Sequence, residues 1–139
     1  MTAAVGTALK EVLCGRLPAV LHCPDLHRSM RFYAGRWGFG MAQSIPGVMA
    51  VLVRESVTVQ LLQRRADESP QPLACRLLVD CMDQWWMQLY SAPGQTPHQL
   101  VEQRWGTEWA ISDCDGNRLL LVQSAPHLAQ RQVQQQVLR

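Results

Sequence analysis

The chain has 139 residues, of which 47% are hydrophobic and 17% are charged, and its formal net charge is +2. These values predict one ordinary globular domain, or two small halves that share a core. The charge is too small and the arginines too scattered for a nucleic-acid-binding surface, and no apolar stretch is long enough for a membrane helix. The first residues lack the order of charge, apolar core and cleavage site that a signal peptide has, so we expect a cytoplasmic protein.

The cysteines point to the same compartment. They number five and lie far apart in the sequence, as Cys14, Cys23, Cys75, Cys81 and Cys114. The odd count and the absence of a Cys-x-x-Cys spacing disfavour a disulfide scaffold and a zinc knuckle. We therefore expect buried free thiols, which suit a reducing compartment.

The first half of the chain predicts a strand, a helix and further strands. Residues 1–16 are expected to form a short helix or a loose arm. An apolar strand is predicted for residues 17–23, and Asp25 is a candidate N-cap for a helix that ends at Gly38. Residues 41–63 are predicted to form two or three strands, two of them over residues 48–54 and 57–63, so the first unit spans residues 17–65.

The second half repeats this order. Residues 66–72 are polar and rich in proline, which predicts a linker. A strand follows over residues 73–79, then Asp80 as a second N-cap candidate, a helix over 82–91, a loop over 93–97 and the last strands over 98–123. Asp25 and Asp80 lie 55 residues apart, which fits a duplicated βαβββ unit with a second copy over 73–123. Residues 124–139 form a glutamine-rich tail.

A tight hairpin closes the second unit. Residues 107–112 and 118–123 are rich in residues that favour strands, and Asp113-Cys114-Asp115-Gly116-Asn117 lies between them. Aspartate bonds its own backbone in turns, and glycine and asparagine accept the positive φ that such a connection needs. The two aspartates are therefore interpreted as turn residues rather than as a catalytic pair.

Two stretches carry a family resemblance. Residues 104–123, RWGTEWAISDCDGNRLLLVQ, resemble the Trp-Gly-x-x-x-Phe-x-x-x-Asp-Pro-x-Gly-Asn segment of the glyoxalase, bleomycin-resistance and dioxygenase superfamily, also called vicinal oxygen chelate, with Cys114 in the place of proline. Residues 23–40, CPDLHRSMRFYAGRWGFG, resemble its first-module signature, Asp-Leu-x-x-Ser-x-x-Phe-Tyr-x-x-x-Leu-Gly-Phe, with Trp37 in the place of leucine. The Trp-Gly and Glu-aromatic pairs most resemble the bleomycin-resistance, antibiotic-sequestering branch.

The resemblance implies a fold and an assembly. It implies an α+β fold in which two tandem βαβββ modules form an open, eight-stranded, barrel-like cleft. In the branch that the sequence resembles most, two chains usually combine and share their cavities, which implies a homodimer. Phe32 and Tyr33 are interpreted as core and helix-packing residues rather than as ligand contacts.

The same resemblance maps the positions at which the enzymes of the superfamily bind a divalent metal ion. Counting from the motifs places them at Pro18, Gln60, Ala74 and Leu120. Three of these side chains have no donor atom, and one neutral amide does not hold a divalent ion. We therefore expect no metal, no cofactor and no catalytic residues.

Strand alternation then suggests a ligand-binding wall made of Trp105, His22, Gln60, Arg76 and Arg118. Resemblance implies that Trp105 stacks on a flat heterocycle, and the arginines suit a planar polar or anionic small molecule. Trp105 as a structural turn residue, and the arginines as surface charges, are the alternatives. The predicted function is metal-independent binding of a small molecule, of which antibiotic sequestration is one form.

Two other functions remain open from the sequence. One is a metal-dependent lyase, isomerase or ring-cleaving dioxygenase of the same superfamily that uses a displaced metal site. The other is a structural or regulatory module that dimerises through its strands and tail.

Overall fold

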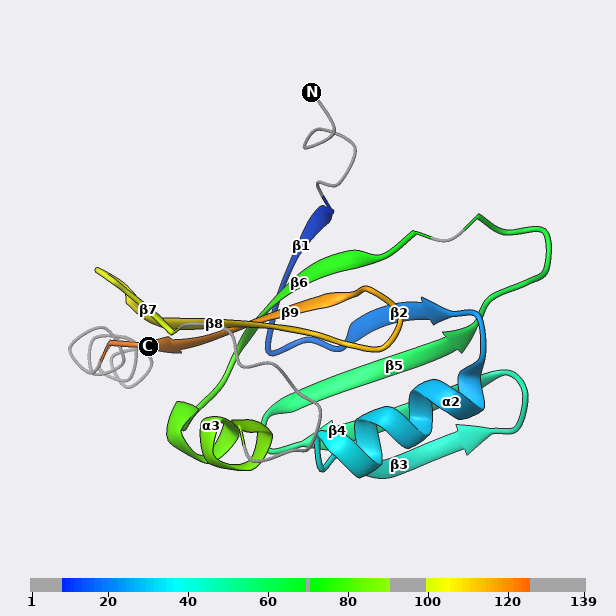
Figure 1. The fold of residues 1–139 in the computed structure, drawn as a ribbon, viewed down its shortest axis with the longest axis horizontal. Coiled ribbons are helices and arrows are strands. Elements are labelled where there is room, and N and C mark those ends of the chain that lie inside the picture. The colour runs from blue at the N-terminus through cyan, green and yellow to red at the C-terminus, as the bar shows by residue number, and fades with distance from the viewer. Residues whose placement is uncertain (1–8, 70, 91–99, 126–139) are drawn as a thin grey trace, which may run out of the picture.

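The fold consists of a five-stranded and a four-stranded β-sheet with two helical segments in the part of the chain that the structure describes (Figure 1), and buried side chains of both sheets belong to one core. The structure is a computed structural model that describes residues 9–69, 71–90 and 100–125, with the backbone alone for residues 86, 88 and 90. The elements in chain order are β1 (Lys10–Gly15), β2 (Ala19–Cys23), α2 (Leu26–Arg31), the π-helical turn η1 (Phe32–Arg36), β3 (Gly40–Ile45), β4 (Met49–Arg54), β5 (Val57–Gln63), β6 (Leu73–Leu78), α3 (Met82–Tyr90), β7 (Val101–Gln103), β8 (Gly106–Ser112) and β9 (Arg118–Ser124).

The two sheets repeat one topology. The first module forms sheet B, with the strand order β2-β5-β4-β3, and the second forms sheet A, with the order β1-β6-β9-β8-β7. Apart from β1, each sheet pairs its first and last strands in parallel and the others antiparallel. The α+β fold and the duplicated βαβββ unit are therefore confirmed.

The first residues depart from the prediction. A short helix or a loose arm was expected over residues 1–16, and this is wrong for Lys10–Gly15, which form β1 and pair in parallel with β6. Pairing with a strand some 60 residues away in the sequence leaves no local signal, and the alternation in this segment is weak because β1 lies at the edge of its sheet. The arm up to residue 8, the loop at residues 93–97 and the glutamine-rich tail lie outside the described residues.

Each helix begins beside the last strand of its own module. Gln63, the last residue of β5, accepts the Leu26 amide at 2.9 Å, and Gln123 of β9 accepts the Met82 amide at 2.6 Å. The predicted cap at Asp25 is present, because its carboxylate accepts the Arg28 amide at 3.1 Å. Side chains from a distant strand thus satisfy amides that a helix start leaves free.

The second predicted cap is not where the sequence placed it. Asp80 lies two residues before α3 and pairs with the Arg16 guanidinium at 2.8 Å. Gln123 takes up the first helical amide, so the duplication is preserved by the glutamines rather than by the aspartates. No helix in the described ranges is long and apolar enough to cross a membrane.

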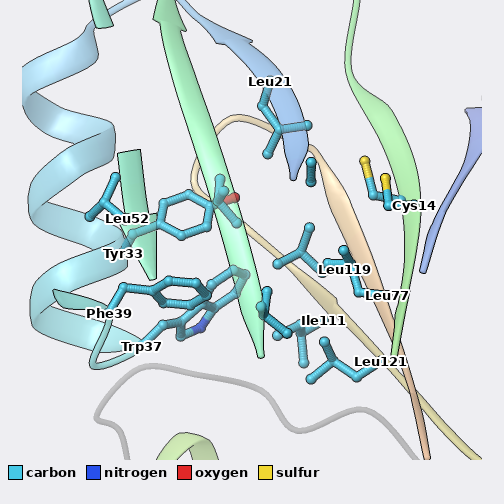
Figure 2. Close-up of a cluster of buried hydrophobic side chains, with 14 of the residues drawn as sticks. Cys14, Leu21, Tyr33, Trp37, Phe39, Leu52, Leu77, Ile111, Leu119 and Leu121 are labelled. Atoms are coloured by element: carbon cyan, nitrogen blue, oxygen red, sulfur yellow. The ribbon is translucent and has the colours of Figure 1, made fainter. Parts of the chain in front are cut away.

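One apolar core joins the two modules (Figure 2). Strand β2 shows the pattern, because Ala19, Leu21 and Cys23 are buried while the residues between them are exposed. The largest fully buried side chains come from both modules and are Trp37, Trp85, Trp109, Tyr33, Leu21, Leu52, Leu61, Leu77, Leu89, Ile111, Leu119 and Leu121. Because the buried faces point toward this common core, the opposite faces of the sheets point outward and away from each other. We call them the open faces.

Candidate functional site

Trp105 stands at the tip of the β7–β8 hairpin, with 46% of its surface exposed. The next residue, Gly106, has φ +147°, and a Cβ there would lie 1.9 Å from the carbonyl oxygen of Gln123. Glycine therefore allows β8 to start against the end of β9, where the Trp105 carbonyl accepts the Ala125 amide at 2.8 Å. The backbone of the Trp-Gly pair therefore has a structural role, while the indole ring remains partly exposed to solvent.

The indole is tied to a carboxylate on the open face of sheet A. Its Nε1 donates to Glu108 Oε2 at 2.5 Å, and Arg76 Nη1 donates to the same oxygen at 2.9 Å. Arg76 belongs to β6 and Glu108 to β8, so the guanidinium reaches across β9, which lies between them. Arg76 Nε also lies 3.5 Å from Glu11 of β1. One arginine therefore ties three strands of the sheet together on this face.

These contacts change the expected charge of the wall. Arg76 was predicted as a cationic ligand contact, yet two carboxylates already face it, and their hydrogen bonds, that to Glu108 first, raise its pKa. Glu11, Arg76 and Glu108 together carry one net negative charge. The surroundings of Trp105 are therefore not basic, and an anion gains little there.

Arg118 lies on the same face but far from Trp105. It opens β9 opposite Ser112, whereas Gly106 pairs with Ser124 at the other end of that strand. Six residues separate the two pairs, which is about 20 Å at the rise of a strand. A small molecule stacked on Trp105 does not reach Arg118 within this chain.

His22 and Gln60 lie on the open face of sheet B. Gln60 pairs with Val20 on one side and Val51 on the other, and His22 pairs with Leu62 in the next row. The predicted alternation is present, since their neighbours along each strand are buried. Because the two open faces point away from each other, this chain alone does not bring His22 and Gln60 to Trp105.

The aspartates of the β8–β9 turn hold the two modules together. Asp113 is buried and accepts four hydrogen bonds, one of them from the Tyr33 hydroxyl at 2.6 Å and the others from the Asp115 amide and from the backbone and side chain of Asn117. Asn117 in turn accepts the Leu73 amide at 2.9 Å. Burial raises the pKa of Asp113, and the hydrogen bonds oppose that shift.

Asp115 joins the same turn to helix α2. It accepts from the Arg28 guanidinium at 2.5 Å and from the Ser29 hydroxyl. Cys114 Sγ lies 3.9 Å from the Ser29 hydroxyl, and burial raises the pKa of the Cys114 thiol. Both aspartates are thus engaged in structural contacts, which supports their interpretation as turn residues.

Burial disfavours the thiolate form of two further cysteines, Cys23 and Cys75. Burial raises the pKa of Cys23 to about 11 and that of Cys75 to about 12. All five cysteines are free; Cys14, Cys23 and Cys75 are buried, as predicted, whereas Cys81 and Cys114 are only partly buried. A protonated, buried thiol is a poor nucleophile.

Two hollows flank Arg28 at the junction of the modules. One of about 250 Å³ is lined in part by His22, Arg28 and Cys114. The other, of about 480 Å³, is lined in part by Arg28, Arg31 and Phe32. Of the predicted site residues, His22 borders the first of these two hollows.

Solved structures share this fold. A bleomycin resistance determinant encoded on the transposon Tn5 matches with a TM-score of 0.62 and 25% identity, over 77% of this chain and 95% of that one. TnmS3, an antibiotic-binding protein from Streptomyces sp. CB03234, matches with 0.64 and 22%, over 78% and 93%. No sequence-family model and no curated protein matches the chain.

A third match extends the comparison to an enzyme. The lactoylglutathione lyase from Agrobacterium tumefaciens matches with a TM-score of 0.59 and 18% identity, over 84% of this chain and 92% of that one. These matches include bleomycin-resistance and glyoxalase proteins of the vicinal oxygen chelate superfamily, whose βαβββ fold this chain shares. At 22% and 18% identity, the second and third matches show a shared fold and nothing more.

The four positions that the motifs map as metal-ligand positions can be placed in the fold. Gln60, Ala74 and Leu120 lie on the open faces, and Pro18 precedes β2. The side chains of proline, alanine and leucine offer no atom to a metal ion. Within residues 9–69, 71–90 and 100–125, no group of three or more His, Cys, Asp or Glu residues is arranged to hold one.

Sequence reasoning missed Glu108 and the partners of Arg76. The sequence could have indicated Glu108, because it follows Trp105 by three residues and strand alternation places its side chain on the open face. The link to Arg76 was not readable, since it depends on which strand separates β6 from β8.

Proposed function

We propose that this protein binds a planar, polar small molecule without a metal ion, as a homodimer in the cytoplasm. The observation that carries the proposal is the occupancy of the four metal-ligand positions by Pro18, Gln60, Ala74 and Leu120, which leaves one neutral amide as the sole donor. Free cysteines support the reducing compartment.

The stacking contact is proposed for Trp105. An exposed, rigid indole suits a flat ring, and stacking contributes about 0.5–1.5 kcal/mol beyond the buried area. Bleomycin-binding and antibiotic-binding proteins are among the structural matches, which makes antibiotic sequestration one form of the proposed function. The wall around Trp105 favours a neutral polar ligand over the anionic one that the sequence also allowed.

A second copy of the chain would complete the site. Sheet B presents Val20 and Ile45 on its open face, 41% and 47% exposed, and Val101 on β7 of sheet A is 46% exposed. Exposed apolar side chains on the face of a sheet favour burial against a partner. Packing the open face of sheet B of one copy over sheet A of another would bring His22 and Gln60 to Trp105.

Tryptophan fluorescence tests the binding. We expect flat heterocycles to quench the fluorescence saturably in the presence of a chelator, and Trp105→Ala to abolish that effect. Quenching that requires an added divalent ion would overturn the proposal and favour the lyase, isomerase or dioxygenase.

Light scattering during gel filtration tests the dimer. Val51→Glu places a charge in the centre of the open face of sheet B, and we expect it to give monomers and to weaken binding. Ala34→Glu places the same charge on the exposed side of η1 and serves as the control. Monomeric protein that still binds heterocycles would contradict the shared site.

A further inference from the structure

Trp105 and Glu108 form a unit in which an exposed ring is held by a nearly buried carboxylate. The Glu108 side chain is only 10% exposed, whereas 46% of Trp105 is exposed. Glu108 Oε2 accepts from both the Trp105 indole and the Arg76 guanidinium, at 2.5 and 2.9 Å. Hydrogen bonds to a charged group are stronger than neutral ones, so one oxygen with two donors is firmly placed.

We propose that Glu108, held by Arg76, is the positioning residue of Trp105, and that its second oxygen selects a flat heterocycle carrying a ring N–H or an amino group. The inference rests on the proposed function, because it concerns the ligand of the same site. It adds a residue and a chemical requirement to that site.

The geometry leaves Trp105 only one way to contact a ligand. Its single donor, the indole N–H, is engaged by Glu108, so the ring contributes its face and no hydrogen bond. Glu108 Oε1 accepts no hydrogen bond from the described residues. Oε1 belongs to the carboxylate that binds the edge of the indole, so a ring stacked on Trp105 that carries an N–H toward Glu108 can donate to it.

A partner for Oε1 also matters energetically. A carboxylate oxygen covered by a bound ring loses its water, and a ligand that cannot donate leaves it unpaired. The difference in binding free energy between a ligand with the donor and one without it is then larger than the contribution of the hydrogen bond alone. We expect a preference on the order of tenfold for the donor-bearing ring.

The positioning role is tested without any ligand, by the indole N–H resonances of ¹⁵N-labelled protein. Trp105→Phe identifies the Trp105 peak. We expect Glu108→Ala to shift that peak upfield and to speed its exchange with water, while the peaks of the buried tryptophans stay in place. Glu102→Ala is the control, since it removes an exposed carboxylate of β7 that alternates to the other face of the hairpin.

A second variant covers the case in which Glu108→Ala does not fold. Arg76→Met keeps the Glu108 carboxylate but removes the guanidinium that donates to it. We expect a smaller shift of the Trp105 peak in the same direction. If the Trp105 resonance is unchanged in every folded variant, Glu108 does not position the ring.

The selection is tested by calorimetry with two matched pairs of neutral probes: benzimidazole with N-methylbenzimidazole, and carbostyril with N-methylcarbostyril. The unmethylated member of each pair is expected to bind more tightly to the natural protein. In Glu108→Ala both members should bind with nearly the same affinity.

Each outcome decides a different point. Binding of both members with equal affinity by the natural protein, or a preference that survives in Glu108→Ala, refutes the selection and leaves the proposed function standing. Failure of all four probes to bind counts against the proposed function and the selection together. The resonance experiment then still decides whether Glu108 positions Trp105.

Discussion

Replacing Tyr33 by phenylalanine removes the contact that joins the two family motifs. The Tyr33 hydroxyl donates to Asp113 at 2.6 Å, and both side chains are buried. A hydrogen bond to a buried carboxylate contributes about 1.5–3 kcal/mol. We therefore expect Tyr33→Phe to lower the free energy of unfolding by about 2 kcal/mol at neutral pH, a large part of the 5–15 kcal/mol that is usual for a domain.

The loss should depend on pH in a definite direction. Burial raises the pKa of Asp113 above its unfolded value, so this group favours the folded state at low pH, and that contribution is lost as pH rises through the folded pKa. The tyrosine hydrogen bond opposes the shift, and removing it raises the pKa further. The cost of Tyr33→Phe is therefore largest where Asp113 is ionised and smaller once it is protonated, because a neutral acceptor binds less strongly.

Urea unfolding followed by circular dichroism measures both effects. The experiment compares the natural protein with Tyr33→Phe at neutral pH and below about pH 4, where a normal aspartate is half protonated. Asp113→Asn supplies the control background, in which Tyr33→Phe should cost less. An equal cost at both pH values and in both backgrounds would refute the coupling of Tyr33 to the ionised carboxylate.

Three further results are expected. Gly106→Ala should cost more than about 3 kcal/mol or prevent folding, since its Cβ would overlap the Gln123 carbonyl, and the soluble yield and urea midpoint measure this. Trp105→Ala should lower the unfolding free energy by about 1.5–3 kcal/mol, because it removes a hydrogen bond to the Glu108 carboxylate, yet the variant should still fold, so lost ligand binding in the folded variant reports the site. In native protein a thiol reagent should label only Cys81 and Cys114, which are partly exposed, and all five cysteines should react after unfolding; labelling of the buried three at the same rate would contradict the core.

Most of the secondary structure was predictable because its signals are local. Strands β5, β8 and β9 have strand-forming residues bounded by turn residues, and the cap at Asp25 marks the start of α2. Strand β1 was not, since its pairing with β6 is non-local.

The candidate site was predictable by strand face but not by position in space. Alternation placed Gln60 and Arg76 on the correct faces of their sheets. That these faces point apart depends on Tyr33 and Trp37 packing between the modules, which no local pattern encodes. The pairing of Arg76 with Glu108 likewise depends on strand order, and with it the charge around Trp105.

The metal content of the untagged protein tests the central claim most directly. It should be measured by mass spectrometry as purified, and again after dialysis against a mixture of Fe²⁺, Ni²⁺, Zn²⁺ and Mn²⁺. We predict far less than one equivalent in both cases, because Pro18, Ala74 and Leu120 supply no ligand and Gln60 alone does not retain a divalent ion. A metal content near one equivalent would contradict metal-independent binding and favour the metal-dependent lyase, isomerase or dioxygenase.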